Sequence, residues 1–278
     1  MTGRFAILAV SAAAFLGQDQ QPRSQPGWPC VGRPDPTYFS IAEATGGQLF
    51  LFDKSEIADA SLSIASRRYE DTLFRVAGSL VDGRHEFPVP IDSAVDDVMF
   101  SVSLQCQQSV EIVTPSGQLL QNTIGEDHAF RAGRIVTLPR PEPGAWRVRV
   151  AGHGLFFLIV QAKSGLSLGR VSFVREGGRP GHEGLFPVPY PPAPAGPQWL
   201  AFDIRGTASD VRARLVTSAF EDITTLSLRE SSSDPTEREF LARVTPPATA
   251  FRLVVSGLDA AGLPFQRMHA PLFAPTRR

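Results

Sequence analysis

The sequence predicts a mainly β protein, with two β-sandwiches in tandem preceded by a short α/β segment. Three observations predict this class. From Thr72 onward, apolar and polar residues alternate with a period of two, the pattern of strands that bury one face. The alternating stretches are short, and residues that favour turns separate them. The stretches fall into two sets of about seven, a number typical of sandwich domains.

Length and charge limit the classes of function that we expect for this protein. With 278 residues, the chain is long enough for two domains with cores of ordinary size. The net charge is −1, and no stretch concentrates lysine and arginine. Binding to phosphates needs such a basic surface, so nucleic acid is not an expected partner.

Residues 1–17 are predicted to be a secretory signal peptide. Arg4 precedes an apolar run that begins at Phe5, and small residues follow up to Ala14. The run is shorter than the ~20 residues of a membrane-spanning helix, so no transmembrane segment is expected after cleavage. Cleavage after Ala14 would cut the apolar run short, and cleavage after Gly17 would put the bulky Phe15 at a disfavoured position, so the sequence does not select between them. We expect a secreted or extracellular protein, periplasmic if its source is bacterial.

Residues 18–34 are polar and rich in Pro and Gln, which predicts a flexible linker. This segment contains Cys30, and the other cysteine of the chain is Cys106. In an exported protein these two residues can form a single disulfide bond. Two unpaired thiols fit the sequence equally well.

Residues 35–70 are expected to fold as helix, strand and helix. Asp35 can cap a helix that starts at Pro36, and Gly46 is placed to end it in a left-handed conformation. The buried face of this helix is predicted to hold Tyr38, Ile41 and Ala42.

The strand of this segment is QLFLF, residues 48–52. It is apolar on both faces and therefore needs cover on both. Asp53 is expected to start a second helix that continues to about Tyr69, with Glu56 at the spacing of a capping box. A segment of about 35 residues is too small to be a self-standing domain.

Residues 71–165 are organised around residues 141–163. Trp146 begins a strand in which alternate residues are apolar, and Gly152-His153-Gly154 is predicted to be a hairpin tip. Residues 155–160 are apolar throughout, so the return strand should lie in mid-sheet with both faces covered. The predicted strands are 73–80, 85–91, 98–104, 110–114, 134–138, 146–150 and 155–161.

Residues 166–278 repeat this pattern. No cysteine follows Cys106, so the second sandwich must hold without a disulfide between its sheets. The stretch Pro187–Pro197 is predicted to be a stiff connection between strands. The predicted strands are 170–175, 199–204, 211–217, 223–228, 239–244, 251–256 and 264–268.

Several stretches resemble a known family. Tyr38–Ile57, YFSIAEATGGQLFLFDKSEI, resembles the C-terminal end of a von Willebrand factor A domain in hemicentins and in the von Willebrand factor A domain-containing protein 7 family. In those proteins a galactose-binding-like sandwich and then an immunoglobulin-like domain follow the A domain. Further similar stretches are Phe87–Leu104, Val110–Leu119, Pro141–Val150, Ser164–Val174 and Gly257–Arg267.

The resemblance implies three domain identities: an A-domain remnant at residues 35–70, a galactose-binding-like sandwich at 71–165 and an immunoglobulin-like sandwich at 166–278. An A domain binds metal through a D-x-S-x-S loop, which this sequence lacks. The nearest string, Asp53-Lys54-Ser55-Glu56, has no second serine. We therefore expect no metal-dependent adhesion site. Either the chain keeps only the tail of an A domain, which the predicted signal peptide favours, or the rest of the domain lies upstream of the given sequence.

Residues 165–169 fit the motif G-x-S-x-G of serine hydrolases. The motif would make Ser167 a nucleophile on a turn between a strand and a helix, and His182 or His269 with Asp203 would have to complete a triad. A strand pattern follows in place of the helix. We expect no enzyme, and a serine hydrolase ranks third among the hypotheses.

Asp92, Asp96 and Asp97, with Glu126 and Asp127 elsewhere, form a weak calcium candidate. Their spacing lacks the dense ladder of Asp, Asn and Gly in a dedicated calcium loop. A turn in which Asp92 accepts hydrogen bonds from the local backbone is the alternative. No zinc motif is present, so we expect no metal ion and no cofactor.

The predicted ligand-binding loop is GEDHAFRAG, residues 125–133. A sugar site combines an aromatic ring with hydrogen-bonding side chains, and the strand alternation assigns Trp146 to the core. This loop groups such side chains at Glu126, Asp127, His128, Phe130 and Arg131.

Two functional hypotheses follow. In the first, the protein is a secreted, non-catalytic module of adhesion or matrix type that binds an extracellular protein or glycan through loops of a sandwich. In the second, it is a structural spacer or assembly domain without a small-molecule ligand.

Overall fold

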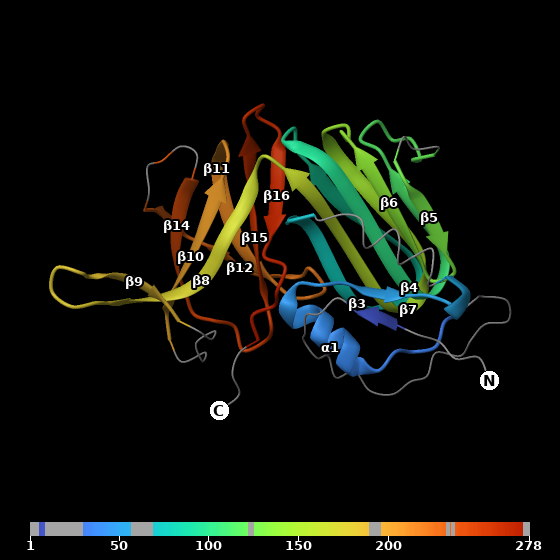
Figure 1. The fold of residues 1–278 in the computed structure, drawn as a ribbon, viewed down its shortest axis with the longest axis horizontal. Coiled ribbons are helices and arrows are strands. Elements are labelled where there is room, and N and C mark those ends of the chain that lie inside the picture. The colour runs from blue at the N-terminus through green and yellow to red at the C-terminus, as the bar shows by residue number, and fades with distance from the viewer. Residues whose placement is uncertain are drawn as a thin grey trace.

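The computed structural model describes residues 6–8, 30–56, 69–121, 125–188, 196–231, 234 and 237–274. Figure 1 shows two β units side by side. We call them the middle unit, within residues 71–165, and the C-terminal unit, within residues 166–278. Helix α1 (Pro36–Thr45) lies against the middle unit. No helix within these ranges is long and apolar enough to cross a membrane. Most of the predicted signal peptide, the linker before Cys30, the second helix from residue 57 to 68, and residues 189–195 of the proline-rich connection lie outside the described residues.

Helix α1 begins and ends as predicted. The Asp35 carboxylate accepts a hydrogen bond of 2.8 Å from the backbone N–H two residues on, and Gly46 adopts a φ of 82°. The buried face differs from the predicted one, because Tyr38 is 42% exposed whereas Ala42 and Glu43 are fully buried. The charged residue Glu43 can occupy the buried face because buried arginines neutralise its carboxylate.

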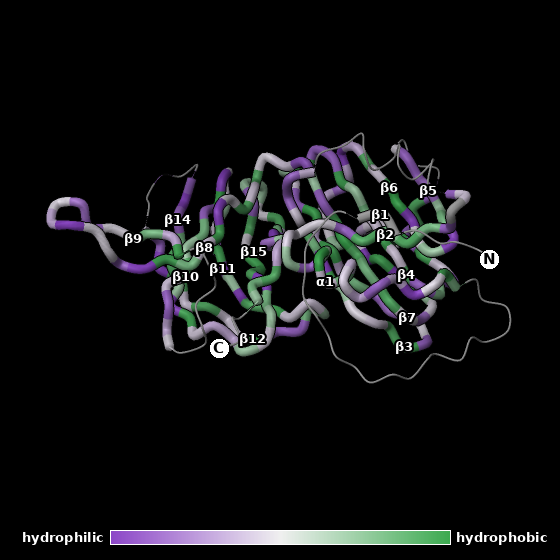
Figure 2. The backbone as a smooth tube through the Cα atoms, turned by 60° about the horizontal axis from the view of Figure 1, so that its bottom comes forward, coloured by the Kyte–Doolittle hydropathy of each residue, from purple (hydrophilic) through white to green (hydrophobic). Residues whose placement is uncertain are grey.

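Strand β2 (Leu49–Leu51) is buried on both faces, as predicted. It pairs antiparallel with β1 (Ala6–Leu8) and lies across the middle sheet, as Figure 2 shows. One face packs against Phe157 of that sheet. On the other face, Phe50 stacks on Phe52 with the ring centroids 5.7 Å apart. The N-terminal segment is therefore a layer on the middle unit.

The middle unit is one antiparallel sheet with the order β3-β7-β4-β6-β5. Six of the predicted short strands are the halves of three long strands, β3, β4 and β7. The predicted hairpin tip Gly152-His153-Gly154 is wrong, because the chain passes through these residues as a single strand. The strands are β3 (Asp71–Ile91), β4 (Val95–Val113), β5 (Asp127–Phe130), β6 (Gly133–Pro139) and β7 (Gly144–Ser164).

A bend shared by neighbouring strands explains this error. Gly152 and Gly154 have φ values of 141° and 91°, and the pairing register shifts beside them in β3 and β4. A Cβ atom at Gly152 would lie 2.1 Å from the carbonyl oxygen of Cys106, so the close approach requires glycine. Glycine serves both hairpin turns and bends within a strand, and a local pattern does not separate the two.

The bend folds the sheet onto itself. Phe100 pairs with Val160 at one end of β7 and Trp146 lies at the other end, yet the rings of Phe100 and Trp146 are 5.5 Å apart. Both halves of the sheet thus bury one core, and the core position of Trp146 is confirmed. Residues 155–160 lie in mid-sheet with Phe157 covered on the outer face, as predicted.

The C-terminal unit is a sandwich of two sheets, ordered β13-β14-β10-β8-β9 and β12-β11-β15-β16. All seven predicted strands are present, and the stretch 223–228 is divided between the two sheets. The hairpin of β8 and β9 extends beyond the body of the unit in Figure 1. The strands are β8 (Ser167–Gly177), β9 (Gly184–Pro187), β10 (Gln198–Arg205), β11 (Ala208–Val216), β12 (Asp222–Leu226), β13 (Leu228–Glu230), β14 (Glu237–Val244), β15 (Arg252–Asp259) and β16 (Pro264–Met268).

Buried charges fix α1 between the two β units. Arg75 of β3, Glu43 of α1 and Arg252 of β15 are all fully buried. One carboxylate oxygen of Glu43 accepts a hydrogen bond of 2.8 Å from Arg75, and the other lies 2.6 Å from Nη2 of Arg252. Arg75 also donates to the carbonyls of Ala42 and Gly46, which the end of the helix leaves without partners. All three parts of the chain share this network.

We expect Glu43→Gln to lower the free energy of unfolding by about 3–5 kcal/mol, because it leaves two arginine charges buried without a carboxylate. Glu86→Gln is the matched control, since Glu86 and Arg149 form an exposed ion pair, and solvent and salt screen such pairs so that they contribute little to stability. Urea unfolding of both variants measures the difference. Similar small losses in both would contradict the structural role of Glu43.

Candidate ligand-binding site

Residues 125–133 form a β-hairpin in place of the predicted loop. Strand β5 pairs antiparallel with β6, and its alternation directs Asp127 to one face and His128 and Phe130 to the other. Nε2 of His128 lies 3.9 Å from a carboxylate oxygen of Glu126. The five predicted binding residues therefore do not share one surface.

Phe130 and Arg131 hold the N-terminal segment. The Phe130 ring is buried and meets the Phe52 ring edge-on at 4.8 Å. The Arg131 N–H donates to Glu56 at 2.8 Å, and the Arg131 guanidinium lies 3.2 Å from the Asp53 carboxylate. Glu56 also accepts the Asp53 N–H at 2.8 Å, the capping-box contact that the sequence predicts. Phe130 is thus a core residue instead of the predicted sugar-binding platform.

The other face of β5 borders the candidate site, a groove of about 670 Å³. Asp127 and Arg134 form its charged wall through two hydrogen bonds of 2.9 and 2.6 Å. Arg134 also donates to the Val110 carbonyl at 3.0 Å. Because the two charges neutralise each other, the wall offers polar atoms without net charge. The lining residues are Gln107, Ser109, Val110, Gly125, Asp127, Ala129 and Arg134.

Gln107 brings an unmet acceptor to this groove. Its Nε2 makes a long hydrogen bond of 3.4 Å to the Phe130 carbonyl, while its Oε1 is buried and has no partner among the described residues. A buried acceptor without a donor is uncommon and unfavourable. A ligand hydroxyl or N–H would relieve this cost by donating to Oε1 once the Gln107 side chain turns toward the groove that it lines.

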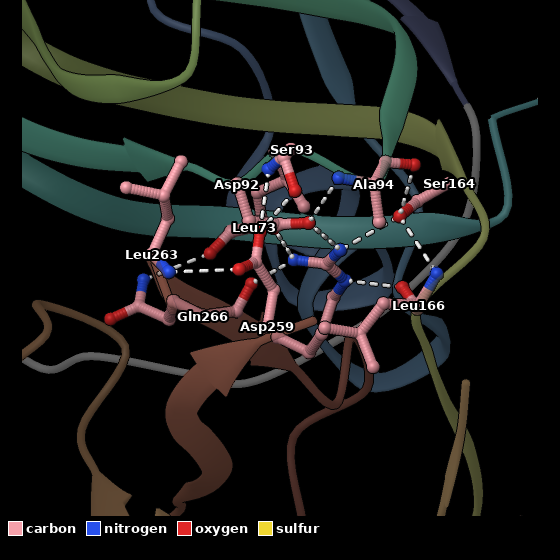
Figure 3. Close-up of polar contacts among 10 residues, drawn as sticks. Leu73, Asp92, Ser93, Ala94, Ser164, Leu166, Asp259, Leu263 and Gln266 are labelled. Atoms are coloured by element: carbon pink, nitrogen blue, oxygen red, sulfur yellow. Dashed lines mark hydrogen bonds and ion pairs between the residues drawn. The ribbon is translucent and has the colours of Figure 1, made fainter. Parts of the chain in front are cut away.

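Asp92, from the predicted calcium candidate, lies at the junction of the two β units (Figure 3). It is 1% exposed, and its carboxylate accepts hydrogen bonds of 2.7 and 3.2 Å from Arg267 of β16. The other N–H groups of Arg267 donate at 2.8 Å to the Leu166 and Gln266 carbonyls and to Ser164 Oγ. The Arg267 guanidinium therefore supplies the positive charge that the calcium hypothesis assigned to a metal ion.

Asp96 and Asp97 do not join Asp92 in one site. Asp97 accepts a hydrogen bond of 3.1 Å from the Tyr69 hydroxyl, and Asp96 is exposed. The alternative of a local turn is confirmed in part, because the Asp92 carboxylate also accepts the Ala94 N–H at 3.2 Å. The Asp92 carboxylate is buried by the C-terminal unit, whereas Ser93 in the same turn is exposed.

A second contact at the junction comes from Asp259, in the hairpin between β15 and β16. One of its oxygens accepts the N–H and the hydroxyl of Ser93 at 2.8 and 2.6 Å. The other accepts the N–H groups of Ala261 and Leu263 in its own turn. Figure 3 shows this carboxylate beside the Asp92 cluster, so two carboxylates join the units here.

Cys30 and Cys106 form a disulfide bond, which selects one of the two alternatives. The bond joins the N-terminal segment to the bend of β4. Val31 is buried and donates its N–H to the Gln105 carbonyl at 2.9 Å, so the predicted linker ends before Cys30. Within the described part of the chain, the one group of three metal-ligating types is Cys30, Cys106 and His153, and its two sulfurs are bonded to each other.

Ser167 lies at the start of strand β8, where a hydrolase motif requires a turn into a helix. Asp203 accepts the Arg170 N–H at 3.2 Å, and the His269 ring stacks on Phe273. Burial lowers the pKa of His269 to about 4. In the ranges that the structure covers, no hydrogen bond joins Ser167 to Asp203, His182 or His269.

The comparisons with known proteins concern mainly the middle unit. Residues 73–165 match the family model described as hemicentin galactose-binding domain-like. The match spans the bent sheet and the groove, and it confirms this part of the resemblance found in the sequence.

Among solved structures, the crystal structure of Bacillus licheniformis lipase BlEst2 in propeptide form shares 13% sequence identity with this chain, at a TM-score of 0.34. The alignment covers 73% of this chain and 41% of the lipase chain, so this chain spans less than half of that protein. A likeness at this level supports no assignment of fold or activity. No match is found among curated proteins.

Sequence reasoning missed Gln107, Ser109 and Arg134 of the groove. A signal was present, since the stretch from Gln105 to Ser109 interrupts an otherwise apolar pattern with polar residues. The structure shows that the register of β4 shifts between Gln107 and Ser109. Such a bulge redirects side chains, and it brings both residues to the groove.

Asp71 adds a titratable group to the junction. Burial raises the pKa of its carboxyl to about 6 from the usual 3.8; Arg267 opposes this shift, and the charges of Glu70 and Asp92 add to it. A raised carboxyl pKa means that the protonated form favours the folded state. The stability that this group contributes is present below pH 3.8 and is lost as the pH rises through about 6.

We expect Asp71→Asn to raise the free energy of unfolding at pH 8 by about 1–3 kcal/mol, because the amide carries no charge and can still accept the Leu168 N–H. Below pH 4 the variant and the parent should have nearly equal stability. Urea unfolding at the two pH values measures this difference, with exposed Asp82→Asn as the control. A variant less stable than the parent at pH 8 would refute the assignment.

Proposed function

We propose that this chain is a non-catalytic extracellular binding module whose ligand lies in the groove between β4, β5 and β6. The observation that carries this proposal is Gln107, a residue of the groove lining whose buried Oε1 has no donor among the described residues. The groove volume of about 670 Å³ falls in the usual range for small-ligand sites, about 300–1,000 Å³. The match to a galactose-binding-like family is consistent with a binding role.

The chemistry of the groove favours an uncharged, hydroxyl-rich ligand such as a glycan. Asp127 and Arg134 neutralise each other, so the wall attracts neither a cation nor an anion strongly. Gln107 offers an acceptor, and the Ser109 hydroxyl can donate and accept. Neighbouring hydroxyls of a sugar can pair with both groups. The family name describes a fold, so it is not evidence for galactose itself.

An extracellular location and an immunoglobulin-like last domain complete the proposal. The disulfide bond and the predicted signal peptide support export to an oxidising compartment. The sheet orders β13-β14-β10-β8-β9 and β12-β11-β15-β16 support the immunoglobulin-like assignment, because apart from β9 they follow the orders D-E-B-A and C′-C-F-G of such a sandwich. We also propose that residues 35–56 are the tail of an A domain, adapted to cover the middle sheet.

A catalytic role is not part of this proposal. The carboxylate in the groove, that of Asp127, is held by Arg134 through two hydrogen bonds. It is therefore not free to act as a general base for the Ser109 hydroxyl, the nucleophilic group among the lining residues.

The second candidate is a structural spacer. The observation that favours it is the pair of buried junctions around Glu43 and Arg267, which join all three parts of the chain. Such a rigid body can set the distance between neighbouring parts of an assembly without binding a small molecule.

We expect the protein to retain neutral oligosaccharides on a glycan array, and Gln107→Ala/Ser109→Ala to weaken this binding about tenfold. The double variant removes two hydrogen bonds of about 0.5–1.5 kcal/mol each. Affinity for the best glycan is then measured by calorimetry for the protein and the variant.

The matched control is Gln118→Ala, an exposed glutamine in a turn outside the groove. It should bind like the parent protein. If no glycan is retained, or if the double variant binds unchanged, the groove is not the binding site and the spacer function becomes the better assignment.

A further inference from the structure

Trp199 lies on the outer face of the C-terminal unit, far along the chain from the groove residues. It belongs to β10, where Arg243 of β14 is its direct partner on one side and Val174 of β8 on the other. The Trp199 side chain is partly buried against an apolar floor. The buried residues of this floor are Val174, Ala201 and Leu241.

Two arginines converge on the Trp199 ring. The guanidinium carbon of Arg229, on β13, lies 5.4 Å from the ring centroid, and that of Arg243 lies 5.9 Å from it. Both arginine residues are exposed. Both distances are measured from the same ring centroid, so the two guanidinium carbons are at most about 11 Å apart. This separation is close to the Debye length, ~10 Å in 0.1 M salt.

These two arginines differ from the others that contact aromatic rings. In the described ranges, six arginine–ring contacts occur. In the other four, a carboxylate pairs with the guanidinium. Arg229 and Arg243 have no such partner within the same ranges. The four paired arginines are Arg75 with Glu43, Arg214 with Asp222, Arg238 with Glu230 and Arg267 with Asp92.

No acidic residue near this face pairs with either arginine in the described ranges. Glu176 lies on the same face of β8 as Val174, and three other acidic residues are engaged elsewhere. Glu230 pairs with Arg238, the Glu239 carboxylate accepts the Ser231 hydroxyl, and Asp203 accepts the Arg170 N–H. Two like charges thus remain uncompensated beside an apolar floor, which strengthens their repulsion. An anion that bridges them would relieve this repulsion, and the indole ring holds both guanidinium groups in place for it.

We propose that Trp199, Arg229 and Arg243 form a binding site for a sulfated glycan. A guanidinium pairs with an oxyanion through two parallel hydrogen bonds, so two of them suit a ligand with repeated sulfate groups. An acidic peptide is a poorer fit, because extended peptides bind by adding to a sheet edge. Arg229 lies on the edge strand β13, but Trp199 and Arg243 lie on inner strands whose backbone groups are already paired. The site is independent of the groove in the middle unit.

The test uses the full chain on immobilised heparin as the sulfated probe, with affinity measured by biolayer interferometry at 0.15 M salt. We expect the parent protein to bind and Arg229→Gln/Arg243→Gln to lose at least tenfold in affinity, since each removes a charge-assisted contact. Trp199→Leu should lose part of the affinity while keeping both charges. Desulfated heparin should not bind.

The matched control is Arg84→Gln/Arg212→Gln, which removes the same net charge at two exposed arginines without a ring contact. It should bind like the parent. Equal losses in the two double variants, absence of heparin binding, or equally tight binding of polyglutamate would each overturn the proposal. Binding of neutral glycans should be unchanged in Arg229→Gln/Arg243→Gln, which separates this site from the groove.

Discussion

Two buried arginines determine how the parts of this protein fit together. Arg75 and Arg267 are each fully buried, and each directs all of its N–H groups to partners. Burying an unpaired charge is strongly unfavourable, so these residues are stable only when Glu43 and Asp92 are in place. Because the partners come from different parts of the chain, folding of each part is coupled to docking of the others.

The same coupling positions the candidate groove. The middle sheet can fold onto itself because Gly152 allows the backbone to pass close to Cys106, and the disulfide to Cys30 ties the N-terminal segment to this bend. The register shift that follows in β4 brings Gln107 and Ser109 to the groove. A bend that a globular core requires thus also shapes a surface suited to a ligand. The arginines on Trp199 lie on the other β unit, which the buried junctions hold against the first.

Predictions from the sequence were accurate where the signal was local. The caps of α1 at Asp35 and Gly46 depend on a few neighbouring residues, and both were predicted. The core position of Trp146 follows from strand alternation alone. The site prediction failed at Phe130, because its burial depends on Phe52, which lies far away in the sequence. The buried face of α1 was misassigned because Glu43 is charged, although Phe39, Ala42, Glu43 and Gly46 have the spacing of one helix face.

The sequence by itself determined the β class, the positions of the seven predicted strands of the C-terminal unit, the helix caps and the likeness of the middle unit to a galactose-binding-like domain. Only the tertiary structure decided that Gly152-His153-Gly154 is a bend, that Asp92 binds Arg267, and that Arg229 and Arg243 share one ring. The physical reason is the range of the interactions. Backbone conformation and the alternation of apolar residues are properties of neighbours in the chain. The environment of a charge depends on groups that folding brings from distant positions.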